Sequence, residues 1–332
     1  MPLIPDAGAM PGEPIPATGR GFAGFAARRL LAAVPVVALV LLLSFVLMRA
    51  VPGGPFDGSR ALTPAVRANL ERRYGLDRPL PEQLLRYVNS LAHGDLGDSL
   101  AQRDRSVADL LAAGAPLSLT LGACALVVTL LGGVGLGAAA ALNEGGGGDR
   151  LVRGLTAAGL ALPTYVLAPA LVLVFGLHLR WLPAGGWESG RLSDALLPVI
   201  AIAWLPLFEV ARLARGSMAA ALAAPYVEAA RARGLANRTL FVHYVLGPAL
   251  RPVLTYLAPL AATVLTGSLV VERLFGLPGM GGFLIDGALA RDYPLVLGAT
   301  LVYLLLLVLL NLLVELLLGL LDPRLRRAWT VR

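Results

Sequence analysis

Lysine is absent from this sequence, cysteine and histidine are scarce, and charged residues taken together are few. Only 15% of the 332 residues are charged and 57% are hydrophobic, whereas soluble domains carry about a quarter charged residues. A soluble domain of this length has too little interior to bury so much apolar surface, but a bilayer accepts that surface directly. The composition therefore excludes an ordinary soluble domain and predicts an integral membrane protein.

The residues that build metal and catalytic sites are equally sparse. Cys124 is the one cysteine and has no partner for a disulfide, and the histidines lie far apart at His93, His178 and His243. Four glycines at 145–148 lack the Gly-Lys-Ser/Thr that completes a phosphate loop, and neither a nucleophile elbow nor an HExxH motif occurs. We therefore expect no catalytic residue, no metal site and no cofactor in this chain.

All 28 basic residues are arginines, and the net charge is +7. A basic protein can bind nucleic acid, but these arginines flank the apolar segments, which is the pattern of membrane topology. We therefore expect contact with the lipid bilayer and none with nucleic acid.

Six apolar runs predict six transmembrane helices, because a helix needs about 20 apolar residues to cross the hydrocarbon core. The runs are 30–48, 115–142, 154–177, a fourth from 195 to the first charge at Glu209, 252–271, and a sixth from 294 past Glu315 to 321. They are continuous rather than alternating, which argues against strands. The first run is longer than a signal-peptide core and lacks a good cleavage site, so we expect it to stay in the protein. The predicted fold class is all-α.

The arginines also predict orientation. Fifteen lie in the segments 20–29, 150–153, 212–251 and 324–332, against four in the short loops at positions 180, 191, 273 and 291. Because basic residues favour the cytoplasmic side, both termini are expected in the cytoplasm. Residues 1–27 would form a flexible cytoplasmic tail, and residues 28–332 the six-helix domain.

Two long connections interrupt the spans. Residues 50–113, on the outer side, carry helix signals at 63–75 and 81–94, and predict a small helical cap that also serves as a docking surface for a partner. Residues 216–251, on the inner side, predict a helix from Pro225 to Gly234, then a second helix capped by Asn237 and broken at Gly247-Pro248. A stiff element of this kind can carry force from a soluble partner.

The inner connection contains a family motif. Glu228-Ala229-Ala230, followed after three residues by Gly234, resembles the EAA-x3-G loop of ABC importer permeases. In that family the loop forms a coupling helix in a cleft of the ATP-hydrolysing subunit; here Gly247-Pro248 stands where the family has Leu-Pro. The resemblance implies that the ATPase contacts are Tyr226, Glu228, Ala229, Ala230, Arg231, Arg233 and Gly234.

Other stretches narrow this to the oligopeptide/dipeptide permease family. They are the segments 51–57, 74–80, 91–99, 181–187, 211–218, 271–281, 291–294 and 321–326. Their order and spacing, over about residues 28–327, are similar to those of the first, B-type permease subunit of oligopeptide permeases. Gly-Pro-Phe-Asp at 54–57 and Leu-Ala-His-Gly-Asp at 91–95 favour an oligopeptide substrate. A dipeptide, glutathione or nickel importer is the alternative within the family.

The resemblance implies a type I ABC importer permease fold in a bacterial cytoplasmic membrane. It also implies a second homologous permease subunit, two ATP-binding subunits that hold ATP and Mg, and an extracytoplasmic peptide-binding protein. Two other classes compete with this reading. A secondary transporter would need ion-binding carboxylates near the middle of the membrane, but Glu209 and Glu315 lie near span ends, and a membrane-embedded enzyme would need a catalytic set.

Six residues are candidates for the translocation pathway or its gate: Pro163, Glu209, Arg212, Arg215, Glu272 and Gly279. Glu209 departs from the resembling family, which looks apolar or small at this position, and a carboxylate in the membrane needs a partner or water. Arg212 lies three residues on and shares its helical face, so we expect a Glu209–Arg212 pair, with a role in the pathway as the alternative. Pro163 permits a bend, and the other three belong to the resembling segments.

Overall fold

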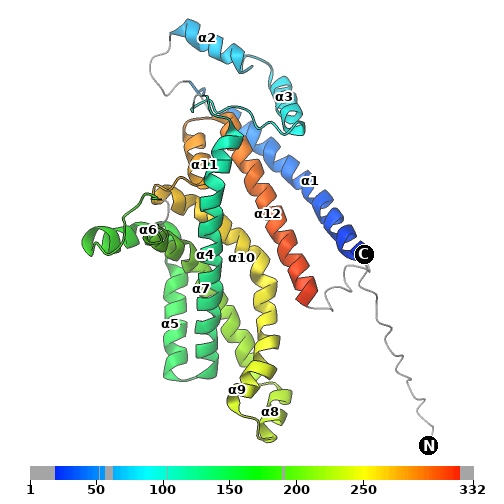
Figure 1. Ribbon diagram of the computed structural model, residues 1–332, viewed down its shortest axis with the longest axis vertical. Coiled ribbons are helices and arrows are strands. Elements are labelled where there is room, and N and C mark those ends of the chain that lie inside the picture. The colour runs from blue at the N-terminus through cyan, green and yellow to red at the C-terminus, as the bar shows by residue number, and fades with distance from the viewer. Residues whose placement is uncertain (1–18, 52, 57–62, 103, 189–190, 322–332) are drawn as a thin grey trace, which may run out of the picture.

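The computed structural model describes residues 19–51, 53–56, 63–102, 104–188 and 191–321. Helices dominate these ranges, and the extended pairing found in them is one isolated bridge between Asp98 and Ser106 (Figure 1). In chain order the helices are α1 (Gly19–Ala50), α2 (Pro64–Arg73), α3 (Leu80–Ala92), α4 (Val107–Leu142), α5 (Gly147–Ala161), α6 (Thr164–Leu171), the π-helix η1 (Val172–His178), α7 (Ser193–Leu222), α8 (Pro225–Ala232), α9 (Asn237–Leu240), the π-helix η2 (Phe241–Val245), α10 (Leu246–Leu274), α11 (Met280–Leu289) and α12 (Tyr293–Leu321).

In the part of the chain that the structure describes, five helical stretches are each long and apolar enough to cross a membrane: α1, α4, α7, the stretch from α9 through α10, and α12. A sixth crossing arises when α5 is counted together with α6 and η1 as one bent span. The predicted all-α membrane fold is confirmed. α1 begins at Gly19, so residues 19–27, predicted as tail, are helical. Residues 1–18 of the predicted tail lie outside the described ranges.

The third predicted span is not one straight helix. α5 ends at Ala161, Leu162 is extended with φ −96° and ψ 108°, and the chain turns by 98° into α6 and η1. Pro163 is the cause, because its ring disfavours a helical conformation at the preceding residue and it has no N–H to continue the helical hydrogen bonds. The uncharged run at 154–177 is therefore split between two helices that are nearly perpendicular.

The connection at 216–251 differs from the prediction in two details. The N-cap of α9 is Ala236 rather than Asn237. The helix is not broken at Gly247-Pro248, because α9 continues through η2 into α10. A π turn is wider than an α turn, and η2 ends at Val245, three residues before Pro248. The residue four positions before the proline therefore lies in the wider turn, which gives the ring the room that a regular α-helix denies it. The chain after Gly234 is therefore already the start of a long membrane helix.

The centre of the bundle is the contact between α4 and α7, the most extensive between any two described helices. Glycines on α4 allow it. A Cβ added at Gly133 would lie 2.8 Å from the carbonyl oxygen of Leu207, and one added at Gly137 would lie 2.7 Å from the Cβ of Ala214. Helices inside a membrane associate through such close packing, since lipid tails are as apolar as the side chains.

Buried apolar side chains form two clusters. The larger one joins parts of α4, α7, α8, η2 and α10, and includes Met218, Val227 and Val245. The smaller one joins the first turns of α4 to α10, α11 and α12, and includes Leu110 and Met280. α4 and α10 run through both clusters and so connect the two ends of the molecule.

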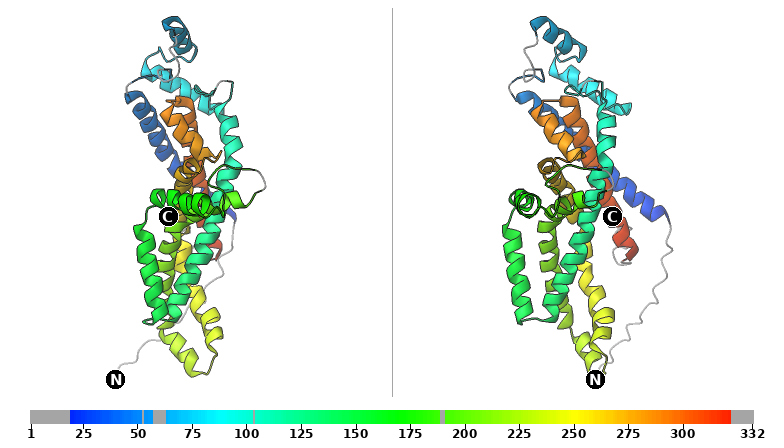
Figure 2. Two further views of the ribbon diagram at one scale, coloured as in Figure 1. Left: turned by 90° about the vertical axis from the view of Figure 1, so that its left-hand side faces the viewer. Right: turned by 60° about the vertical axis from the view of Figure 1, so that its left-hand side comes forward.

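α2 and α3 form a cap at one end of the elongated bundle, and α8 and α9 lie at the other end (Figures 1 and 2). Hydrogen bonds to α1 and to the start of α12 help to hold the cap and the chain that follows it to the bundle. The buried carboxylate of Asp292, at the start of α12, accepts hydrogen bonds from the Ser99 hydroxyl and, at 3.1 Å, from the Ala101 N–H. Arg49, at the end of α1, donates to the side chain of Gln83 in α3. The predicted helical cap is present at 63–92.

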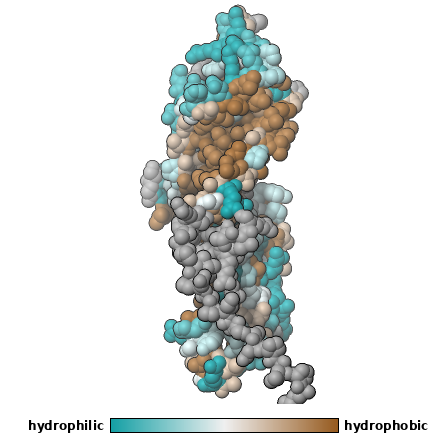
Figure 3. All heavy atoms as spheres, turned by 90° about the vertical axis from the view of Figure 1, so that its right-hand side faces the viewer, coloured by the Kyte–Doolittle hydropathy of each residue, from teal (hydrophilic) through white to brown (hydrophobic). Residues whose placement is uncertain are grey.

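α1 and α12 pack together and present a broad apolar face beneath the polar cap (Figure 3). Only 6% of the apolar window of α1 and 11% of that of α12 is buried, against 56% for α7. α7 is therefore an interior helix, and α1 and α12 have their apolar sides free for lipid or for another subunit. Arg29 and Glu315 form an ion pair between these two outer helices.

Candidate functional site

α8 projects from the end of the bundle opposite the cap (Figure 1). Pro225 occupies its first position, where the missing N–H costs no helical hydrogen bond. Of the predicted contact residues, those exposed are Tyr226, Glu228, Ala229, Arg231, Arg233 and Gly234. Ala230 is fully buried next to Val227, so these two side chains attach α8 to the bundle while the others face outward.

Gly234 ends this element with a left-handed backbone. Its φ is +79°, and its N–H donates to the Arg231 carbonyl at 2.9 Å. A Cβ at this position would meet no atom within 4 Å, so the backbone conformation alone favours glycine here. The turn reverses the chain between α8 and α9, as the motif predicts.

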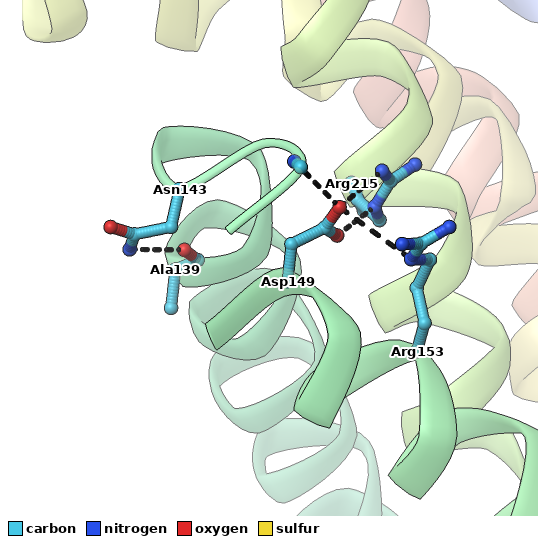
Figure 4. A network of polar contacts seen from close by, with 6 residues as sticks. Ala139, Asn143, Asp149, Arg153 and Arg215 are labelled. Atoms are coloured by element: carbon cyan, nitrogen blue, oxygen red, sulfur yellow. Dashed lines mark hydrogen bonds and ion pairs between the residues drawn. The ribbon is translucent and has the colours of Figure 1, made fainter. Parts of the chain in front are cut away.

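Arg215, on α7, forms a bidentate ion pair with Asp149 in the first turn of α5 (Figure 4). The guanidinium Nε and Nη2 lie 2.6 and 2.9 Å from the two carboxylate oxygens. Asp149 also accepts the Gly145 N–H at 3.1 Å and lies 3.5 Å from the Nε of Arg153. The negative charge lies at the N-terminus of α5, where the helix dipole stabilises it. The pair attaches the turn between α4 and α5 to the helix that leads into α8.

Glu209 has a partner other than the predicted one. The Tyr256 hydroxyl, from α10, donates to its carboxylate at 2.7 Å, and the side chain of Arg212 is exposed. A donor from the neighbouring helix satisfies a carboxylate that would otherwise be costly in the membrane. The expected Glu209–Arg212 pair is therefore replaced by a contact that joins α7 to α10.

Glu272 and Gly279 meet at the cap end, where α10 passes into α11. The carboxylate of Glu272 is fully buried and accepts the Gly281 N–H at 2.7 Å, while the Ser118 hydroxyl on α4 accepts the Met280 N–H at 2.9 Å. These acceptors satisfy the first N–H groups of α11, because its N-cap, Gly279, has no side chain to do so. A Cβ at Gly279 would overlap the Glu272 carboxylate. Both residues therefore fix the turn at residues 275–281, at the cap end of the bundle.

The predicted residues thus lie at separate levels of the molecule. The α8 residues form one exposed element, and Arg215 and Glu209 join helices inside the bundle. Pro163 marks the break in the third span, and Glu272 and Gly279 shape the turn at 275–281. Within the described ranges, no three side chains among His, Cys, Asp and Glu are grouped as a metal ion requires. What this arrangement can do is dock a partner and transmit movement.

Sequence reasoning missed the partners of these residues. Asp149 carried a usable signal, since it follows a glycine run at a helix start, where a carboxylate is favourable. Ser118 and Tyr256 are single polar residues within apolar runs, and their role appears only when α4, α10 and α11 are brought together.

Comparisons with known proteins agree with this architecture. Residues 133–327 match the family described as binding-protein-dependent transport system inner membrane component. The chain is 42% identical over 302 residues to the oligopeptide transport system permease protein OppB of Salmonella typhimurium, covering 91% of this chain and 99% of that protein. It is 38% identical to the dipeptide transport system permease protein DppB of Bacillus subtilis, covering 90% of this chain and 96% of that protein.

A solved structure of an amino acid ABC transporter with histidines shares 18% identity at a TM-score of 0.49, over 63% of this chain and 93% of that chain. That likeness is too slight to add to the assignment, which rests on the family match and on the two permeases. The chain therefore belongs to the family of inner membrane components of binding-protein-dependent transport systems, and it is a multi-pass ABC importer permease.

Proposed function

We infer that this chain is one permease subunit of an ABC importer that moves oligopeptides across the bacterial cytoplasmic membrane. The names of relatives that align along nearly the whole chain support the peptide substrate. The single observation that carries the mechanism is the placement of α8 at the end of the bundle opposite the polar cap. This short helix has one exposed polar face, and on its other face Val227 and Ala230 are buried against the bundle.

Both termini and α8 face the cytoplasm, and the cap faces outward. The support is the excess of arginines at 20–29 in the first part of α1, at 150–153 in the first turns of α5, at 212–251 around α8, and at 324–332 after α12. The exposed residues of α8, the turn after it and α9 include Arg231, Arg233 and Arg238 against the single acidic Glu228. This balance suits a groove with acidic side chains on the partner.

Two ATP-binding subunits bind ATP with Mg and hydrolyse it, and their closure moves α8. Val227 of α8 packs in the same cluster as Met218 of α7 and Val245 of η2. Because packed interiors have few voids, α8 cannot shift without moving these helices. The coupling residues thereby pass movement of the ATPase to α7 and α10.

On the outer side, a peptide-binding protein docks at the cap, and the turn at 275–281, the outer turn, helps to draw its peptide into the membrane. A second homologous permease completes the pathway, and the apolar sides of α1 and α12 offer one broad surface for its contact and for lipid.

Since peptides present the same backbone groups whatever their sequence, we expect no tight substrate site in this chain alone. The DppB relative makes a dipeptide importer the second candidate.

Reconstitution in lipid vesicles with candidate partner subunits tests the proposal. ATP hydrolysis stimulated by peptide-loaded binding protein, together with peptide uptake, is the expected result. A longer peptide should stimulate hydrolysis more than a dipeptide does. A complex that assembles with ATP-binding subunits but hydrolyses ATP at one rate, with or without loaded binding protein, would contradict it.

Gly234 provides a matched pair of variants for the coupling role. Gly234→Val is expected to abolish most stimulated hydrolysis, because a β-branched residue is strained at φ +79° and the α8–α9 turn must change. Gly234→Asn should keep most of it, since asparagine tolerates the left-handed region. Full uptake by an assembled Gly234→Val complex would refute the coupling role.

A further inference from the structure

The carbonyl of Gly159 lies one turn before the break between α5 and α6. In an uninterrupted helix it would accept the N–H of residue 163, but Pro163 has none. The carbonyl instead accepts the indole N–H of Trp204, on α7, at 3.0 Å. The amide N–H of Leu162 lies at the longer distance of 3.4 Å. The shorter of these two bonds to the freed carbonyl therefore comes from another helix.

The packing around this bond leaves no spare room. Trp204 and Phe208, one turn apart on α7, meet edge to face with ring centroids 5.0 Å apart and an interplanar angle of 81°. Gly159 is buried, and a Cβ there would overlap the Phe208 ring. Phe208 thus holds the indole in place, and the absence of a side chain at position 159 lets α5 approach it.

The other end of α5 is attached to the same helix. Asp149 forms its bidentate ion pair with Arg215 of α7, so α5 is joined to α7 near its start and near its end (Figure 4). α7 leads through two residues into α8. Movement of α8 that shifts α7 must therefore carry α5 and the bend at Pro163 with it.

Beyond the bend, the chain reaches the outer turn. The loop after η1 contacts the chain just after α10, where the Gly186 N–H donates to the Phe275 carbonyl at 2.8 Å. A Cβ at Gly185 would lie 2.7 Å from the same oxygen, so this contact is close. The direction in which α6 and η1 leave the bend therefore decides how this loop meets the outer turn.

We propose that Trp204 is a positioning residue for transport: its indole N–H fixes the bend at Pro163, so that movement of α7 reaches the outer turn through α6, η1 and the loop at 185–186. The claim that α7 moves rests on the proposed function of α8. The hydrogen bond between Trp204 and Gly159 lies within this chain, so its effect on the bend can be tested separately from the function of α8.

Trp204→Phe is the most direct test, because its phenyl ring can still pack against Phe208 but has no N–H to donate. Spin labels at Leu151→Cys on α5 and Leu177→Cys on η1, both exposed, report the bend by electron–electron distance measurement. The measurement uses the assembled complex in nanodiscs. Cys124 is replaced by serine, so that in this permease the labels attach only at the two introduced cysteines. Trp181→Phe, at a tryptophan that is 71% exposed, is the matched control.

In Trp204→Phe, the population of the bent conformer relative to other conformers should fall about five-fold. Loss of one hydrogen bond changes a conformational equilibrium by about that factor. Peptide taken up per ATP hydrolysed should fall by a similar factor, with assembly and nucleotide binding unchanged. Gly159→Ala should shift the same label distance through its overlap with Phe208. Trp181→Phe should leave both readouts as in the unmodified complex.

An unchanged distance distribution in Trp204→Phe or in Gly159→Ala overturns the proposal, and so does unchanged uptake per ATP in Trp204→Phe. Failure of the proposed function has a different signature, since the unmodified complex would then show no hydrolysis stimulated by loaded binding protein. The label distances still decide whether Trp204 fixes the bend in that case.

Discussion

At the scale of single residues, this protein keeps carboxylates in an apolar bundle by giving each a donor from another helix or turn. Asp149 has Arg215, Glu209 has the hydroxyl of Tyr256, and Glu272 has the N–H of Gly281. A carboxylate without such a donor would be expensive in hydrocarbon, so each pairing also dictates which elements lie together. The polar residues of the spans are therefore part of the architecture.

The Asp149–Arg215 pair predicts a measurable effect on stability. Asp149→Asn leaves Arg215 without its bidentate partner and should lower Tm by a few degrees, the scale that loss of one structural contact produces in a chain of this size. The readout is thermal unfolding of the protein in nanodiscs. Glu188→Gln is the matched control, because its ion pair with Arg191 is exposed, at 68% and 64%, and such pairs contribute little. Equal Tm values for the two variants would contradict the account.

Residue types were readable from the sequence, but their partners were not. Glu209 and Arg212 share a helical face by spacing, yet the structure gives Glu209 a donor from α10 instead. Spacing along one helix predicts which side chains are near neighbours, and it carries no information on what the next helix presents. Glu272 and Gly279 were found by resemblance, and only the structure explains why one needs the other.

At the scale of elements, local signals predicted helix ends well where they are strong. Pro64 and Gly75 bound α2, Gly94 follows α3, and Pro225 and Gly234 bound α8. These signals act through the backbone of the residue itself, so they need no tertiary context.

Prediction failed where neighbouring turns changed the outcome. Gly247-Pro248 has the chemistry of a break, but the π turn η2 before it lets the helix continue. Pro163 predicts a bend, and its 98° angle depends on α7, which supplies the donor for the freed carbonyl. α11 was missed because a helix of ten residues does not resemble a membrane span.

The packing of α4 on α7 predicts opposite effects for two nearby glycines. Gly137→Ala should destabilise the protein by about 1–3 kcal/mol, because its Cβ would lie 2.7 Å from the Cβ of Ala214 and the helices must separate. Gly135→Ala, at an exposed position with nothing within 4 Å, should be neutral or stabilise by up to about 1 kcal/mol. Unfolding in mixed micelles with increasing SDS measures both. A Gly137→Ala protein as stable as Gly135→Ala would show that this interface is loose.

At the scale of the whole molecule, two ends with different surfaces are joined by shared helices. The cap lies at one end and α8 at the other (Figure 2). α4 and α10 contribute side chains to both buried clusters. Composition and apolar runs predicted the membrane fold, and the EAA-x3-G resemblance predicted the permease family to which the chain belongs. Because the chain belongs to that family, the alternative of a secondary transporter is wrong. The relative placement of the two ends needed the structure, because it depends on the bend, the π turns and the α4–α7 packing.

The central claim is that α8 receives movement from an ATP-binding subunit on the cytoplasmic side, and thiol cross-linking tests it most directly. Ala229→Cys, on the exposed face of α8, is placed in a Cys124→Ser background, with Val88→Cys on α3 of the cap as the control. In the assembled complex, Ala229→Cys should cross-link to an ATP-binding subunit with a yield that changes when ATP is added, and Val88→Cys should not. Absence of that product, or labelling of Ala229→Cys from outside the cell by a reagent that cannot cross the membrane, would contradict the account.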